Sequence, residues 1–500
     1  MRLRLVSAVI GQLLRLFCVA FVPPLLLAAW DTDWWSALGF AGAGAVGAAF
    51  GTLLSWGYTR PRLFHRAEAM AVVAGTWLVV AAFAGVPYLF AGLGWADAFF
   101  ESMSGLTTTG ATILADFSPY GRSFFLWRAM TQWFGGLGVI ALFVVILPRI
   151  GIAGRQLFFA ESSSAPGEDV SPKIRQGASK LWVLYVALTV LCGLGLFASG
   201  LGVYDSVVHA LTTLAAGGFS PNGSSIAGYA NPAVEWTLVP FMFLAGASFP
   251  LQVRVFTGAA PKGFLRDQEF VFYAAIAAAS TLLLSVILAD GAPGLEALRA
   301  ASFQVTSLMS STGFASTDYN LWPGSAKMVL LLVMVVGGCA GSAAGGPKAV
   351  RHLLVGRHLL REVRQTLHPR AVLPLRYNGR AVSHPVMRAV FALAVLYVGG
   401  YFVVGVLLVW MGLPMVAAFT ASLACLGNIG PGFDAVGPMG SFAGLSVGAK
   451  VLLTGAMWVG RLEILTVIAL LHPDVWRSIR LGRRRPDEDR SPRRMRTPLW

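Results

Sequence analysis

The stretch Thr107-Thr108-Thr109-Gly110-Ala111-Thr112 decides how this 500-residue chain is organised, because three imperfect copies of it follow downstream. The copies read AAGGFS at 215–220, SSTGFA at 310–315 and LGNIGP at 426–431. These four segments, called motif loops 1 to 4 in chain order, each lie between two apolar runs long enough to cross a bilayer. Re-entrant loops that line an ion pathway have this arrangement. The sequence therefore predicts four loops around one axis and a cation pathway along it.

The composition is that of a membrane protein. Hydrophobic residues make up 56% of the sequence and charged residues 12%, whereas soluble globular proteins have about 25% charged residues. The net charge of +15 would indicate nucleic-acid binding in a soluble protein. Here Lys and Arg lie mainly between the apolar runs and in the C-terminal tail, as in the positive-inside pattern, so no nucleic-acid partner is expected. The cysteines lie in or beside apolar runs without metal-ligand spacing, so neither disulfides nor a zinc site is expected.

We expect an all-α polytopic membrane protein with two leading helices and four helix–pore-loop–helix repeats around one central pore. The leading helices are predicted near 7–30 and 34–57, and the basic loop at 60–66 follows them. The repeats are predicted to contain helices near 68–92 and 127–147, 181–199 and 236–256, 270–289 and 327–350, and 389–411 and 447–471. The glycines taken as equivalent in the four repeats are Gly110, Gly218, Gly313 and Gly430.

These positions divide the chain into six parts. The expected boundaries are 1–66 for the leading helices and basic loop, 67–180, 181–268, 269–388 and 389–474 for the four repeats, and 475–500 for a basic tail. The second helix of the third repeat is expected to be broken. About ten spans in total place both termini on the same side, which the basic connections identify as the cytoplasm.

The loops that carry the motifs are acidic and are therefore expected outside. An acidic mouth would raise the local cation concentration. The acidic residues concerned are Asp97, Glu101, Asp116, Asp205, Glu235, Asp290, Glu296, Asp318 and Asp434.

The residue types of the motifs suit a partly dehydrated monovalent cation. Backbone carbonyl dipoles can hold such an ion, glycine permits the narrow backbone they need, and threonine or serine either adds hydroxyl oxygens or holds the loop by hydrogen bonds. Short helices of about three turns at most are expected before the loops, with their negative C-terminal ends facing the ion. They are predicted at 96–106, 206–214, 295–308 and 416–425. Because no motif contains a carboxylate, a divalent filter is disfavoured and K⁺ is the first choice.

The chain resembles the TrkH-type potassium uptake proteins, of the superfamily that also contains the Ktr and HKT transporters. Besides the motif loops, the resemblance rests on TQWFGGLG at 131–138, GGCAGS at 337–342 and GRLEILT at 460–466. It covers nearly the whole chain, and two leading helices are typical of the TrkH subgroup. Glycine at Gly110 resembles the K⁺-selective members, since relatives that admit Na⁺ are expected to carry serine there.

Carried over position by position, the resemblance implies a potassium-binding selectivity filter with K⁺ as its only metal. The filter residues would be Thr108, Thr109 and Gly110; Ala216, Gly217 and Gly218; Ser311, Thr312 and Gly313; and Asn428, Ile429 and Gly430. Loop 2 departs from the pattern, because Ala216 and Gly217 stand where a hydroxyl residue is expected.

The segment from Gly337 to Pro347 contains five glycines and a proline inside an apolar run, which disfavours a helix. Non-helical backbone at membrane depth must be buried in protein or line a cavity. We therefore expect a mobile constriction under the filter, and the resemblance likewise implies an intramembrane gating loop; a small-residue site of helix packing is the alternative. The expected gate residues are Gly337, Gly338, Gly341, Gly345, Gly346, Lys348 and Arg461.

Two ionisable residues fall inside the last predicted span. Arg461 and Glu463, two residues apart on one helix, would point to nearly opposite sides. Arg461 is expected to face the inner pore as an electrostatic barrier, and Glu463 to form a structural ion pair with Lys348 or Arg351. By contrast, Arg128, Gln132 and Trp133 are expected to anchor the outer end of a helix at the interface. His209 is expected to pack against its own short helix.

Two functions remain open on the sequence. One is a channel-like K⁺ uptake pore, and the other is an obligatorily coupled K⁺/H⁺ or K⁺/Na⁺ symporter. A coupled carrier needs an ionisable residue at its binding site, and none of the motifs has one, which favours the pore. The histidines are scattered without catalytic spacing, so no enzyme is expected.

The partners are expected from the resemblance. It implies a homodimer in the cell inner membrane with a cytosolic ring of nucleotide-binding subunits of the TrkA kind. This chain has no phosphate-binding glycine motif, so no cofactor is expected on it. The basic tail from Arg477 to Arg496 either lies against anionic membrane lipid or docks a regulator.

Overall fold

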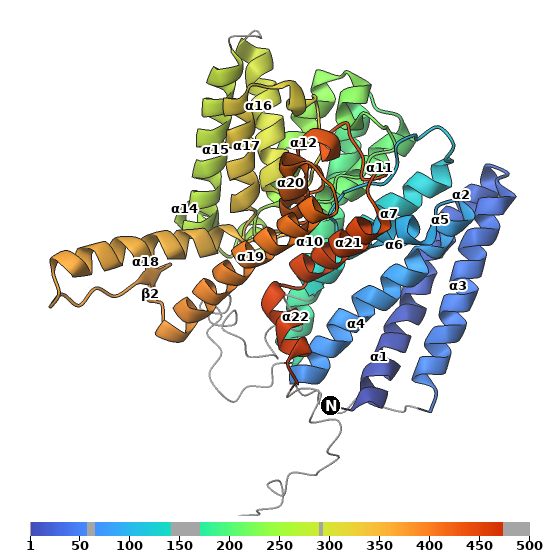
Figure 1. Cartoon of the computed structure of the whole chain (residues 1–500), viewed down its shortest axis with the longest axis horizontal. Coiled ribbons are helices and arrows are strands. Elements are labelled where there is room, and N and C mark those ends of the chain that lie inside the picture. Colours follow the sequence, from blue (N-terminus) through green and yellow to red (C-terminus); the bar gives the residue numbers. More distant parts are fainter. Residues whose placement is uncertain (1, 58–65, 142–170, 290–293, 474–500) are drawn as a thin grey trace, which may run out of the picture.

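The computed structural model describes residues 2–57, 66–141, 171–289 and 294–473. The predicted basic tail and most of the basic loop at 60–66 lie outside the described residues. Within them the chain is almost entirely helical (Figure 1). The one sheet found in the described part is a two-stranded antiparallel ribbon of β1 (Arg376–Tyr377) and β2 (Arg380–Ala381), in which Arg376 pairs with Ala381. The expected fold class, a multi-pass all-α membrane protein, is confirmed.

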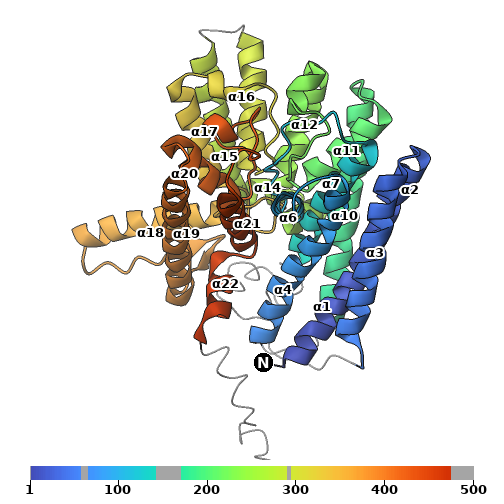
Figure 2. The same cartoon turned by 45° about the vertical axis from the view of Figure 1, so that its right-hand side comes forward.

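The leading helices form a separate layer at one flank of the molecule. The first consists of α1 (Leu3–Phe17), a 3₁₀ turn and α2 (Val22–Trp30), and it packs along α3 (Trp34–Ser55). A Cβ on Gly11 would meet the backbone oxygen of Gly51, so small residues allow the two helix backbones to touch. Figure 2 shows this layer on the opposite flank from α18 (Ala349–Leu367) and α19 (His384–Trp410).

The four expected repeats are present, each with a long first helix, a short helix, a motif loop and a second helix. The first repeat contains α4 (Arg66–Ala84), α5 (Val86–Phe90), α6 (Trp95–Leu106) and α7 (Arg122–Ala141). The second contains α10 (Ser171–Ala198), α11 (Val203–Leu214), α12 (Pro232–Ala245) and α13 (Phe249–Phe256), and α14 (Gly263–Arg266) follows it. The third contains α15 (Gln268–Leu288), α16 (Gly294–Met309), α17 (Gly324–Val336) and α18. The fourth contains α19, α20 (Met415–Leu426), α21 (Val447–Arg461) and α22 (Ile464–Leu471).

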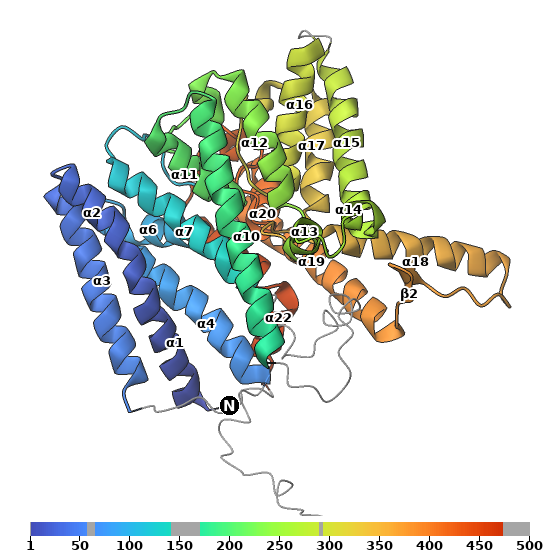
Figure 3. The ribbon, with the colours of Figure 1, turned by 180° about the vertical axis from the view of Figure 1, so that it is seen from behind.

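The repeats surround a buried centre. Seen from behind, α10 runs between the leading helices and the helices of the third repeat (Figure 3). The start of α1 and the end of α22 lie at the same end of the molecule (Figure 1). The short helices α6, α11 and α20 have 12 residues each, or about 18 Å at roughly 1.5 Å per residue. This length is a little over half of a hydrocarbon core of roughly 30 Å, so these helices are too short to cross it. α16, with 16 residues, is longer than the three turns expected.

The lengths of the long helices agree with a multi-pass chain. In the described part, six helices are long and apolar enough to cross a membrane, and two bent pairs of helices add up to two more. The remaining two of the ten expected spans are α7, which ends where the described residues end, and α17, which is short because non-helical backbone follows it.

Within the described residues, the second helix is broken in three repeats and not in the third alone. The break in the third repeat was expected. α12 and α13 meet at 103°, and α21 and α22 meet at 107°, so the predictions of single helices at 236–256 and 447–471 are wrong. Gly246 and Pro250 lie at the first of these breaks. At the second, Glu463 adopts a left-handed backbone conformation with φ 61°, which ends the helix.

Candidate ion pathway

Each motif loop begins at the end of a short helix in the same backbone conformation. In loop 1 the amide of Thr109 donates to Ser104 O at 2.8 Å and that of Thr108 donates to Gly105 O at 2.9 Å. These two bonds form a Schellman motif, whose left-handed residue is usually glycine or asparagine. The left-handed residues here are Thr108, Ala216, Ser311 and Asn428, with φ between 51° and 57°.

Of these four residues, only Asn428 is of a type that favours the left-handed conformation. For the others the conformation costs about 1–2 kcal/mol each. The loops therefore keep a side chain at this position in spite of strain.

The equivalent glycines of the four loops interlock in a closed ring. They all have positive φ, between 75° and 103°. A Cβ on Gly110 would meet Gly217 O, one on Gly218 would meet Thr312 O, one on Gly313 would meet Ile429 O, and one on Gly430 would lie 2.8 Å from Thr109 O. In each case the carbonyl belongs to the residue just before the glycine of the next repeat. The loops thus surround one axis in chain order, as the sequence predicts.

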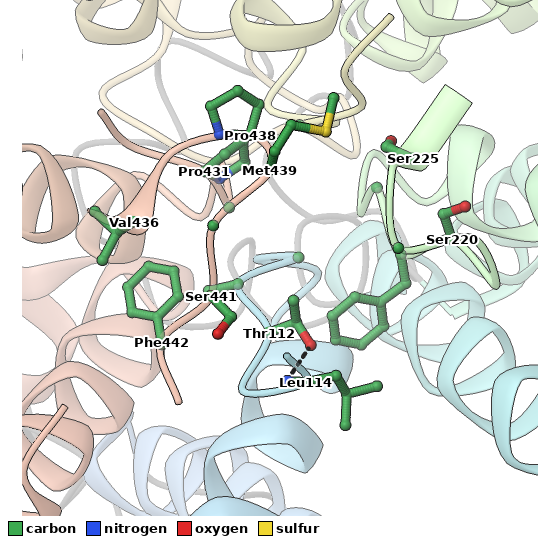
Figure 4. Close-up of a pocket in the computed structure, with 18 of the residues that line it drawn as sticks. Thr112, Leu114, Ser220, Ser225, Pro431, Val436, Pro438, Met439, Ser441 and Phe442 are labelled. Carbon is green, nitrogen blue, oxygen red and sulfur yellow. Dashed lines mark hydrogen bonds between the residues drawn. The ribbon is translucent and has the colours of Figure 1, made fainter. Parts of the chain in front are cut away.

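A cavity of about 320 Å³ lies over this ring and is lined by all four of its glycines. Figure 4 shows its walls, with Thr112 and Ser441 from the first and fourth repeats and Ser220 and Ser225 from the second. Among the described residues, none that lines it is acidic, and Arg128 is part of its wall.

Ion pairs neutralise part of the expected acidic mouth. Glu101 is buried against Arg128, and Asp97 binds Lys450 Nζ at 2.5 Å. Asp116 lies exposed between loop 1 and α7, where the backbone amide and hydroxyl of Ser118 lower the pKa of its carboxyl.

Hydroxyl groups brace loops 1 and 3 in the same way. The hydroxyls of Thr107 and Thr109 lie 2.7 Å apart, as do those of Ser310 and Thr312. In loop 4, Asn428 Nδ2 donates to Thr109 Oγ1 at 3.0 Å and joins the fourth loop to the first.

Two oxygens at the left-handed position have no such role. Thr108 Oγ1 and Asn428 Oδ1 are buried and have no hydrogen-bond partner in the part of the chain that the structure describes. Burying an oxygen without a hydrogen-bond partner costs free energy of folding, unless a bound group interacts with that oxygen.

The prediction of interfacial anchoring on α7 is wrong for Arg128 and Gln132, which are buried. Arg128 is 1% exposed, its Nε donates to Glu101 Oε1 at 2.8 Å, and its Nη1 donates to Ser220 O at 3.1 Å. Gln132 is fully buried and contacts loop 2. Trp133 donates through Nε1 to Thr189 at 3.2 Å.

The sequence did contain a signal for these roles. Arg128 and Gln132 are four residues apart and so share one face of an otherwise apolar helix. In the second repeat, His209 packs as predicted, with Nδ1 2.7 Å from Asp205 O and Nε2 3.1 Å from Ser220 Oγ.

Residues 337–348, called the central segment, are non-helical and mostly buried, as predicted. The alternative of a helix-packing site is wrong because no helix forms there. The segment pairs with the break between α12 and α13: the amides of Cys339 and Ala343 donate to the carbonyls of Gly246 and Ala245 at 2.8 and 3.1 Å. It also touches the loops, since Gly345 N donates to Ser311 Oγ at 2.7 Å.

Charged groups hold both sides of the central segment. Arg461, 5% exposed, donates through Nη1 to Ala343 O at 3.0 Å, and Lys348 Nζ donates to Ala344 O. Among the described residues, Nε and Nη2 of Arg461 have no hydrogen-bond partner. On the other side, Glu269 Oε1 accepts from the amides of Ala340 and Val350 at 2.6 and 3.1 Å. The sequence reasoning missed Glu269.

The two ionisable residues of the last span do not share one helix. Arg461 ends α21, and Glu463 lies in the break before α22. Glu463 pairs with Arg351, one of the two partners proposed for it, at 2.5 Å.

Comparisons with known proteins agree with this architecture. A family model described as a cation transport protein, TrkH, matches residues 39–474. The chain is 32% identical to the Trk system potassium uptake protein TrkH of Salmonella typhimurium over 95% of this chain and 100% of the relative. It is 33% identical to TrkH of Halomonas elongata at the same coverage. The crystal structure of the potassium transporter TrkH from Vibrio parahaemolyticus superposes with a TM-score of 0.87 at 31% identity, covering 95% of this chain and 100% of that one. The chain therefore belongs to the TrkH family of cation transport proteins, which are transporters and not enzymes.

Proposed function

We propose that this protein takes up K⁺ through a selectivity filter formed by the four motif loops. The observation that carries the proposal is the closed ring of Gly110, Gly218, Gly313 and Gly430, under a cavity open to the loops. Its relatives are named potassium uptake proteins. A ring of backbone groups contributed by four loops suits a monovalent cation, because carbonyl dipoles can replace part of its hydration shell.

The filter residues proposed from the sequence are those of the ring and the two positions before each glycine. The C-terminal ends of four buried helices point into these loops, and each carries a partial negative charge of about half a unit. Thr108 Oγ1 and Asn428 Oδ1, buried without hydrogen-bond partners among the described residues, are oxygens that a dehydrated cation at the inner end of the filter would satisfy.

The central segment is the proposed gate. It lies against loops 3 and 4, since Gly345 donates to Ser311 and a Cβ on Gly345 would lie 2.8 Å from Asn428 Cβ. Arg461 and Lys348 both donate to carbonyl groups of this segment. Their positive charges oppose K⁺ for as long as the segment stays in place.

Channel-like transport is the favoured mechanism, and obligatory coupling to H⁺ or Na⁺ is the alternative. A coupled carrier needs a titratable group that senses the ion. None of the proposed filter residues is titratable, and the buried Glu101 beside loop 1 is bound to Arg128 at 2.7 Å. Glu101 is thus held in an ion pair, and it does not line the cavity over the ring.

In the cell, the protein is proposed to lie in the inner membrane as a homodimer with both termini cytoplasmic. A cytosolic nucleotide-binding subunit of the TrkA kind would supply regulation, and this chain would need no cofactor. The basic tail then lies on the side of anionic lipid and of that subunit.

Flux into liposomes that contain only the purified protein tests this function. We expect K⁺ and Rb⁺ to enter faster than Na⁺ and Li⁺ with the proton gradient clamped at zero. Flux that appears only with a proton or Na⁺ gradient would support the coupled symporter. Equal flux of all four cations would contradict the proposed filter.

A further inference from the structure

Loop 2 lacks the hydroxyl brace that loops 1 and 3 share. The positions equivalent to Thr107 and Thr109, and to Ser310 and Thr312, are Ala215 and Gly217. Gly217 nevertheless contributes its carbonyl to the ring, because that oxygen is the one a Cβ on Gly110 would meet. Glycine has a wider choice of backbone conformations than other residues, so a glycine at this position needs support from elsewhere to hold one conformation.

The side chain of Gln132 fills the place of the missing brace. From α7 of the first repeat, its Nε2 donates to Gly217 O at 2.6 Å, and its Oε1 accepts from the amide of Phe219 at 3.1 Å. The backbone amide of Phe219 can only donate, so it fixes which end of the glutamine amide faces Gly217. A Cβ on Gly217 would collide with the Gln132 carboxamide. Glutamine therefore occupies the space that a threonine would take.

We infer that Gln132 is a positioning residue for ion selectivity, which braces loop 2 from a neighbouring repeat in place of a loop hydroxyl. The inference rests on the proposed function and adds to it a residue outside the motif loops. The bonds from Gln132 to Gly217 and Phe219 span the ring glycine Gly218, so they fix the direction of the peptide on each side of it. Without these two hydrogen bonds, the carbonyl of Gly217 is free to rotate out of the orientation that the equivalent carbonyls have in the other loops.

A double-mutant cycle in the full-length protein tests this inference. Gln132→Ala removes both hydrogen bonds of the brace. We expect the K⁺/Na⁺ flux ratio to fall roughly fivefold, which is the effect of about 1 kcal/mol for the bond to the ring carbonyl of Gly217. Gly217→Ser alone forces a side chain against Gln132 and also lowers the ratio. In the double variant the serine enters the vacated space, and the ratio is expected to recover above that of either single variant. Coupling of this kind is expected for residues that share contacts or space, whereas substitutions at distant, independent sites have additive effects.

Gln252→Ala is the matched control. Gln252 is an equally buried glutamine whose Nε2 donates to Leu244 O at 2.8 Å, away from the motif loops, so the flux ratio should stay at the unsubstituted value. A Gln132→Ala ratio equal to that of the unsubstituted protein would overturn the inference and leave the filter proposal intact. So would a double variant that is no better than Gly217→Ser. If the unsubstituted protein itself fails to discriminate K⁺ from Na⁺, the proposed function fails and the inference falls with it.

Discussion

Gly110→Ser tests whether the interlocked ring sets ion selectivity. Gly110 has φ 81°, and a Cβ there would meet Gly217 O and lie 3.3 Å from Gly217 C. The left-handed conformation costs a side chain about 1–2 kcal/mol, and overpacking costs about 1–3 kcal/mol more. The atom in the way is backbone, so no side-chain rotation relieves the contact. Loop 2 must move instead.

The two costs add up to about 2–5 kcal/mol. We expect displacement of the Gly217 carbonyl to relieve part of this strain. Since about 1.4 kcal/mol corresponds to a tenfold change in an equilibrium, we expect the K⁺/Na⁺ ratio to fall about tenfold or more. The assay is the reversal potential under K⁺ and Na⁺ gradients across a bilayer, which is independent of the amount of active protein.

The control separates backbone strain from the contact across the ring. Gly412, between α19 and α20, has φ 93° and no described atom within 4 Å of its Cβ position. Gly412→Ser therefore carries a similar conformational cost without touching a motif loop, and its ratio should equal that of the unsubstituted protein. If Gly110→Ser and Gly412→Ser give the same ratio, the ring of glycines does not determine selectivity.

Three further variants test the groups around the ring. Arg461→Ala removes a positive charge that contacts the central segment and should raise K⁺ flux severalfold in liposomes; unchanged flux would contradict its role in the gate. Glu101→Gln leaves Arg128 buried without its carboxylate, at a cost of about 3–5 kcal/mol, and should lower the thermal unfolding midpoint. Combining Glu101→Gln with Arg128→Met removes the unpaired charge and should restore part of the lost thermal stability. Glu463→Gln breaks a pair with Arg351 whose side chains are 24% and 20% exposed, so at about 1 kcal/mol or less it should lower the midpoint less than Glu101→Gln does.

The architecture follows from local features of the sequence. The short helices predicted at 96–106 and 206–214 appear as α6 and α11, at 95–106 and 203–214. Apolar runs and glycine-rich motifs specify these elements without knowledge of the neighbouring repeats. The prediction of a non-helical stretch after 337 succeeded for the same reason, since its glycines and proline oppose a helix wherever it lies.

The residues behind the loops depend on contacts between repeats, which one sequence does not reveal. Gln132 and Gly217 are 85 positions apart, and a polar residue near a helix end suits an interface as well as a buried brace. The break at Leu462 and Glu463 contains no proline, and its nearest glycine, Gly460, lies inside α21. The backbone of Glu463 is left-handed, and its side chain pairs with Arg351, which is 112 positions away in the sequence.

Hydrogen bonds at the helix breaks connect the central segment to the second and fourth repeats. Its amides bind carbonyls at the break between α12 and α13, and in return Phe249 N at that break donates to Gly341 O at 3.1 Å. Arg461, beside the third break, donates to Ala343 O. Each break exposes backbone groups that a continuous helix would satisfy, and buried groups of this kind must find partners. Movement of the central segment therefore has to exchange hydrogen bonds in the second and fourth repeats at once. Opening by such a movement is accordingly expected to be a step between two arrangements, and not a gradual widening.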